Sequence, residues 1–189
     1  MGAFHNTALW ENHPDGIVYV DGWVCGFKGD PPAGDLVLRE GTRGISEFAM
    51  KGCVNLTSVL IPPSVMGIGR GAFDGCTGLT SITIPCGSIY HQFNKNPLTH
   101  VTITPGAGST VWGHPPTAFF YDEPFRGHRT LESVVIMEGV TTIQGFAFAY
   151  CQNLTNVEIP SSVTSISDNA FLRCDKLNLQ TLEKIKLIQ

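Results

Sequence analysis

A repeat of 23 residues constrains the fold of this chain more than any other feature of its sequence. When residues 36–58 are aligned with residues 59–81, five apolar or small positions coincide. The coincident pairs are Leu38 with Ile61, Ile45 with Ile68, Ala49 with Ala72, Cys53 with Cys76 and Leu56 with Leu79. The same register returns without a gap in residues 134–156 and 157–179. A fixed period of about 20 to 50 residues is typical of stacked units that cannot bury their apolar side alone, so we predict a solenoid.

Each coil is expected to contain one strand, as in the segment LTSVLIP that begins at Leu56. Alternation along a strand points Val59 and Ile61 inward and sends Ser58 and Leu60 to the opposite face. One strand per coil builds a parallel sheet, and its outward residues across the array are Ser58, Leu60, Ser81, Thr83, His100, Thr102, Ser133, Val135, Asn156 and Glu158.

The second half of each unit is too short for a stable isolated helix, so we expect a single helical turn or a tight bend there. Its phenylalanine, at position 73, 148 or 171, is expected to fill the interior between coils.

Three segments carry the repeat most clearly, namely IPPSVMGIGRGAFDGCTGL (61–79), EGVTTIQGFAFAYCQNL (138–154) and IPSSVTSISDNAFLRCDKL (159–177). Their shared pattern resembles the BspA-like class of leucine-rich repeat. The resemblance implies an α/β-type solenoid dominated by β, a right-handed coil with a parallel sheet on one face and short helical turns or bends on the other. Proteins of this class are typically surface or secreted proteins of host-associated bacteria and some protists. The resemblance therefore implies a noncatalytic protein-interaction module, at the cell surface or secreted, that adheres to proteins of a host or of other cells.

We interpret residues 1–189 as one solenoid with three irregular parts. Residues 16–35 form a variant unit, residues 104–125 an insertion where the period breaks, and residues 178–189 a possible C-terminal cap. Gly2-Ala3-Phe4 matches Gly71-Ala72-Phe73, so the chain opens in the middle of a repeat and we expect it to be a fragment of a longer protein.

The variant unit begins with two alternating apolar runs around Asp21-Gly22. An Asp-Gly pair supplies the positive φ angles of a type I′ turn, which predicts a β-hairpin over residues 16–27. Tyr19, Trp23 and Phe27 are then expected to stack on the end or flank of the solenoid.

Charge and hydropathy exclude several classes of partner. Charged residues make up 15% of the chain and the net charge is -4, so there is no basic stripe of the kind that nucleic acid or anionic lipid requires. No apolar run reaches the 18 or more residues of a membrane span, so we predict no membrane insertion in this region. The N-terminus also lacks the features of a signal peptide.

Four of the six cysteines, Cys53, Cys76, Cys151 and Cys174, fall on one repeat position. This position faces the interior in every coil, so we predict buried free thiols, although the spacing of neighbouring coils does not by itself exclude a disulfide. Counting from Phe125 places His128 at the same position.

No cofactor, metal site or catalytic activity is predicted. The sequence has no C-x-x-C or H-E-x-x-H spacing. Cys86 and His91 form a nearby Cys/His pair outside this repeat position, but nothing supplies an orienting third group or an oxyanion site.

The candidate partner surface combines aromatic and arginine side chains of the irregular region with outward residues of the strands beside it, because Trp, Tyr and Arg dominate interface energies. Its residues are His100, Thr102, Trp112, His114, Phe119, Phe120, Tyr121, Arg126, Arg129, Ser133 and Val135. Two other functions remain open at this point, a carbohydrate-binding or cell-wall accessory domain and a structural spacer. The aromatic side chains could also fold back on the flank of the solenoid as a satellite core.

Overall fold

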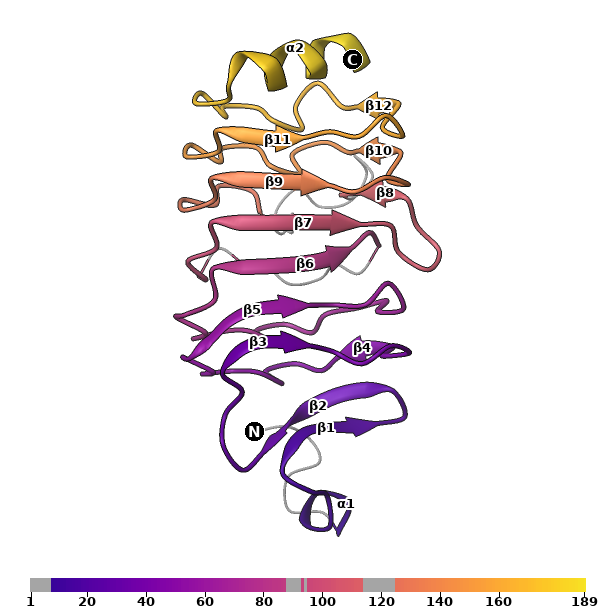
Figure 1. Ribbon diagram of the computed structural model, residues 1–189, viewed down its shortest axis with the longest axis vertical. Coiled ribbons are helices and arrows are strands. Elements are labelled where there is room, and N and C mark those ends of the chain that lie inside the picture. The colour runs from indigo at the N-terminus through magenta and orange to yellow at the C-terminus, as the bar shows by residue number, and fades with distance from the viewer. Residues whose placement is uncertain (1–7, 88–92, 94, 114–124) are drawn as a thin grey trace.

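The computed structural model describes residues 8–87, 93, 95–113 and 125–189, and these residues form a solenoid (Figure 1). Six strands lie side by side as one parallel sheet in the order in which they occur along the chain. They are β3 (Gly34–Val37), β5 (Leu56–Leu60), β6 (Ser81–Pro85), β7 (His100–Thr104), β9 (Ser133–Ile136) and β11 (Asn156–Glu158). The predicted solenoid, with a parallel sheet that takes one strand from each coil, is therefore confirmed.

Short strands line a second wall of the coils and run in the opposite direction in Figure 1. They are β8 (Val111–Trp112), β10 (Thr142–Ile143) and β12 (Ser165–Ile166), which pair in parallel, and β4 (Gly44–Ile45), which pairs with the hairpin. Bends connect this wall to the next strand of the main sheet, as expected from segments too short to form helices.

The predicted hairpin consists of β1 (Gly16–Val20) and β2 (Trp23–Lys28), and it follows the short helix α1 (Ala8–Glu11). Asp21 and Gly22 have φ values of 48° and 81°, which is the turn chemistry that the Asp-Gly pair predicts. Tyr19 and Phe27 pack against the core, but Trp23 keeps 40% of its surface exposed. It lies over Gly44, where the absence of a side chain leaves room for its ring.

A continuous stack of phenylalanine rings fills the interior. Phe73, Phe93, Phe125, Phe148 and Phe171 follow one another with centroid distances of 5.9, 5.6, 6.0 and 5.4 Å. Trp112 joins the stack, 5.9 Å from Phe125 and 6.2 Å from Phe148. The rings therefore link the coils on both sides of the broken period.

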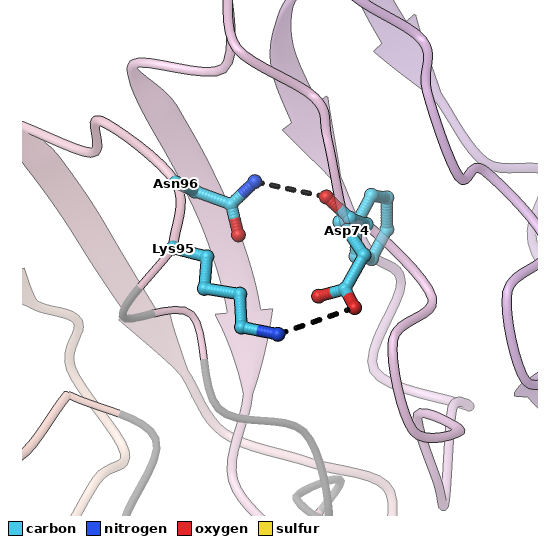
Figure 2. A network of polar contacts seen from close by, with 4 residues as sticks. Asp74, Lys95 and Asn96 are labelled. Atoms are coloured by element: carbon cyan, nitrogen blue, oxygen red, sulfur yellow. Dashed lines mark hydrogen bonds and ion pairs between the residues drawn. The ribbon is translucent and has the colours of Figure 1, made fainter.

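The cysteine position forms a ladder of hydrogen bonds between coils. Cys76, Cys151 and Cys174 each donate through Sγ to a backbone carbonyl of the preceding coil, over 3.0, 2.9 and 3.1 Å. Asn96 holds the same position in the coil before β7, and its Nδ2 donates to the carbonyl of Phe73 over 2.9 Å. Figure 2 shows Asn96 and its neighbour Lys95 both reaching towards the preceding bend, where Lys95 pairs with Asp74 at 3.6 Å.

All six cysteines are buried and free. The predicted burial of Cys53, Cys76, Cys151 and Cys174 is therefore confirmed, and so is the placement of His128, which has 1% of its surface exposed.

Helix α2 (Leu179–Ile188) covers the last coil. Asn178 caps its N-terminus by accepting a hydrogen bond from the backbone N–H of Thr181. The hydroxyl of Thr181 accepts a hydrogen bond from the N–H of Val157 and donates one to its carbonyl, both over 3.3 Å. The helix therefore supplies the hydrogen-bond partners that a further strand would otherwise provide.

Candidate functional site: the outward face of the main sheet

Two rows of side chains run across the outward face of the sheet, because the parallel strands are in register. One row is Asp35, Ser58, Ser81, His100, Ser133 and Asn156, and the other is Val37, Leu60, Thr83, Thr102, Val135 and Glu158. Each of these side chains is exposed or half-buried, whereas Val59, Ile82 and Val134 between the rows are buried. The predicted inward and outward positions are therefore confirmed.

Four of the predicted site residues lie together in the middle of this face. We call these four, His100, Thr102, Ser133 and Val135, the central strip. His100 lies opposite Ser133 and Thr102 lies opposite Val135 on the neighbouring strands β7 and β9. Atom Nδ1 of His100 lies 2.8 Å from Oγ1 of Thr99, which orients the exposed imidazole. The central strip thus offers hydroxyl groups, one imidazole and one aliphatic side chain to a partner.

The β3 end of the same face carries stronger contact groups than the central strip, and the sequence analysis did not select them. Val37 and Leu60 lie side by side with 66% and 40% of their surfaces exposed. Just beyond the end of β3, the guanidinium of Arg39 lies 3.9 Å from the centroid of the Tyr19 ring of the hairpin. Tyr and Arg side chains next to exposed apolar surface are common at interface hot spots.

Asp35 holds a fixed negative charge beside this apolar pair. Its carboxylate accepts hydrogen bonds from Ser58 Oγ at 2.7 Å and Thr57 Oγ1 at 3.1 Å. These two donors lower the pKa of Asp35, with Ser58 the larger cause, because they stabilise the charged form.

The structure does not bring Trp112 and Arg126 to the strip. Trp112 is 0% exposed and is part of the ring stack, so its assignment as a surface anchor is wrong. A tryptophan that fills the interior between two coils buries far more apolar surface than one in a loop. Arg126 lies instead over the rings of Phe146 and Tyr150, at 4.9 and 5.6 Å.

Arg129 is exposed, and its backbone carbonyl accepts a hydrogen bond from Asn153 in the next coil. His114, Phe119, Phe120 and Tyr121 lie outside the described residues, so their role in binding stays a prediction.

A half-open groove of about 410 Å³ lies between β11, the last strand of the main sheet, and α2. It is lined by Asn156, Val157, Glu158, Ile159, Gln180, Thr181 and Lys184.

In the described part of the chain, no group of three or more His, Cys, Asp or Glu side chains is placed so that it could hold a metal ion. Nor does any helix among the described residues have the length and hydropathy needed to cross a membrane.

The comparison with protein families decides the relationship of the chain. Residues 27–109 and 119–189 match the family described as the BspA type leucine-rich repeat region, in six copies. The chain belongs to this family. The repeat and the resemblance found in the sequence are thus confirmed.

Solved structures give further likenesses. A leucine-rich cell surface protein from Faecalibacterium prausnitzii A2-165 is 30% identical, with 82% of this chain and 34% of that chain covered and a TM-score of 0.46. A leucine-rich repeat protein from Bacteroides ovatus is 24% identical, with 73% and 40% covered and a TM-score of 0.42. The leucine-rich repeat protein of T. pallidum is 24% identical, with 80% of this chain and 82% of that chain covered and a TM-score of 0.41.

The chain therefore spans about a third of the length of the F. prausnitzii protein and 40% of that of the B. ovatus protein. No match was found among curated protein sequences.

Proposed function

We propose that this chain is a noncatalytic protein-binding module of a BspA-type surface protein, and that it adheres to proteins of a host or of other cells. The observation that carries the proposal is the pair of outward rows on the six-stranded sheet. These side chains lie on top of a core that is complete without them, so a solenoid can vary them without a loss of fold. Membership of the family and the likeness to a bacterial cell surface protein support a surface location.

The size of the face indicates how a partner would bind. Six strands spaced by about 4.8 Å, each about 16 Å long, give a face of roughly 400 Å². A stable interface buries about 800 Å² on each partner, so even the whole face is too small by itself. We infer that a partner covers the strip and the β3 end, where Val37, Leu60 and Arg39 supply apolar and cationic contacts, and that it also contacts surface beyond the sheet.

The carbohydrate-binding alternative depended on exposed aromatic rings in the irregular region. Its candidate rings are Trp112, Phe119, Phe120 and Tyr121, and the ring of Trp112 is buried. The described residues thus supply no observation that favours this function over protein binding, and none favours a structural spacer.

Binding of the full chain to immobilised extracellular-matrix proteins, measured by surface plasmon resonance, tests the proposal. Thr102→Arg and Leu60→Arg place a bulky charge on the outward face and should weaken binding at least tenfold. Ser165→Arg is the matched control, because Ser165 is exposed on β12 in the other wall. Equal losses for Ser165→Arg, or no binding to any protein of the panel, would contradict the proposal.

A further inference from the structure

His128 is a buried imidazole at a ladder position that other coils fill with a thiol. Cys76, Cys151 and Cys174 occupy the equivalent positions, and each meets its backbone acceptor with an S–H group. His128 makes the equivalent contact through Nε2, which lies 3.2 Å from the carbonyl oxygen of Phe93. A thiol at this position stays neutral in mild acid, whereas an imidazole titrates there.

The hydrogen bond fixes the state of the ring. A carbonyl oxygen only accepts, so Nε2 must carry the proton, and in the neutral ring Nδ1 is then a bare acceptor. Nδ1 is buried and has no hydrogen-bond partner in the part of the chain that the structure describes. The ring of Phe125 packs against the imidazole edge to face, with 6.2 Å between centroids. A second proton would therefore place a cation in an apolar interior, where the new N–H on Nδ1 has no acceptor among the described residues, which is costly.

Charged groups near His128 in sequence or in the preceding coil do not offset that cost. Lys95 has its side chain 77% exposed and pairs with Asp74, Arg126 lies over Phe146 and Tyr150, and the side chain of Arg129 is exposed. These three are cations.

In the next coil, the Cys151 thiol follows His128 in the ladder, and burial raises its pKa to about 12, so it stays neutral. Among the described residues, no carboxylate forms an ion pair with the imidazole.

We propose that His128 is an acid-sensitive element of the solenoid, and that uptake of a proton at Nδ1 opens the coil that leads into β9. The coil boundary involved is the one between Phe93 and Phe125, where the imidazole holds the preceding bend. The Thr130 hydroxyl, which donates to the carbonyl of Leu98 over 2.8 Å, ties the same two coils and would be released with it.

The direction of the pH effect follows from burial. Desolvation lowers the pKa of His128 below its ordinary value of 6.5, and this outweighs the hydrogen bonds to the carbonyls of Phe93 and Asn96, which raise it. The opened coil takes up a proton as the pH falls through about 6.5, while the closed coil resists. The stability of the closed coil is therefore complete above pH 6.5 and falls below it, until the lowered pKa is reached.

The two strands that this coil boundary joins, β7 and β9, carry the central strip. Proton uptake at His128 would therefore disturb His100, Thr102, Ser133 and Val135 together. The inference itself concerns the fold and does not require that the strip binds a protein.

Hydrogen exchange of the full chain, followed by mass spectrometry at pH 7.5, 6.5 and 5.5, tests the inference. After correction for the intrinsic pH dependence of exchange, residues 125–136 should exchange up to about tenfold faster for each pH unit below 6.5, because opening takes up one proton. His128→Cys and His128→Asn should abolish this acceleration, since Cys151 and Asn96 show that both side chains suit the ladder.

His100→Asn is the matched control, because His100 is exposed on β7, and it should keep the acceleration. Acceleration that persists in a folded His128→Cys or His128→Asn chain would overturn the inference. Protection of residues 125–136 that stays constant from pH 7.5 to 5.5 in the unmodified chain would overturn it as well, whether or not the variants fold.

Discussion

Phe148 shows how single residues hold neighbouring coils together. Its ring is fully buried and stacks on Phe125 at 6.0 Å, on Trp112 at 6.2 Å and on Phe171 at 5.4 Å. Each coil has only its neighbours as packing partners, so a missing ring leaves a cavity that no distant element can fill.

We predict that Phe148→Ala lowers the free energy of unfolding by about 3–5 kcal/mol, the usual cost of removing a buried phenylalanine ring. Thr83→Ala, on the outward face of β6, should cost less than about 0.5 kcal/mol. Urea titrations followed by far-UV circular dichroism would compare the two variants. Similar losses for both would show that the inward and outward positions had been exchanged.

The buried cysteines allow a second test at the scale of residues. Burial raises the pKa of Cys174 to about 11 and those of Cys86 and Cys151 to about 12, because desolvation disfavours the thiolate. The thiolate is the reactive form, so we predict that these thiols react with iodoacetamide at pH 8 only after unfolding. Mass spectrometry of peptides labelled with and without urea measures this. Complete labelling of the native chain within minutes would contradict the ladder.

At the scale of elements, the contact between α2 and β11 differs from the other contacts of the main sheet, because a helix takes the place of the next strand. The backbone N–H and carbonyl of Val157 meet the single hydroxyl of Thr181, which is buried. In the interior of the sheet, the corresponding groups bond to the next strand. These two backbone groups of Val157 therefore depend on one side chain for their hydrogen bonds.

We predict that Thr181→Val lowers the free energy of unfolding by about 1–3 kcal/mol, because a methyl group leaves both Val157 groups without a partner. Lys186→Ala in the same helix should change stability little, since Lys186 is exposed. Thermal unfolding of both variants gives the comparison, and an unchanged melting temperature for Thr181→Val would show that water replaces the hydroxyl.

Regular elements were predictable from the sequence because their positions repeat. The strands, the Asp21-Gly22 turn and the ladder place of His128 all follow from spacing or local turn chemistry. Asn96 was missed because only one residue separates it from Leu98, whereas two separate Cys76 from Leu79. Counting three residues from Phe93 would have found it, as counting from Phe125 found His128.

Trp112 was mistaken for a different reason. It lies in a segment whose spacing departs from the period, so sequence distance gave it no place in a coil. Trp112 stacks on Phe125 and Phe148 across gaps of 13 and 36 residues. Contacts of this kind depend on how the chain returns to the core after an irregular segment.

At the scale of the whole molecule, two layers of contacts join the coils: the parallel sheet from β3 to β11 and the stack of rings from Phe73 to Phe171. Both are continuous across the broken period, since β7 pairs with β9 and Phe93 stacks on Phe125. In a repeat array, stability is roughly a sum of terms for each unit and each interface. The weakest interface therefore decides whether the halves unfold together.

Phe125 is the residue whose loss should separate them. Its ring contacts Phe93 on one side and Phe148 and Trp112 on the other, and it packs against His128. We predict that the unmodified chain unfolds in one transition and that Phe125→Ala unfolds in two. Hydrogen exchange in increasing urea should show residues 34–85 and 133–177 losing protection together in the first case and at different urea concentrations in the second.

Phe73→Ala is the matched control, since Phe73 is equally buried but lies one coil away from the junction. It should lower stability without splitting the transition at β7 and β9. A single transition in Phe125→Ala would mean that the hydrogen bonds between β7 and β9 suffice to couple the halves.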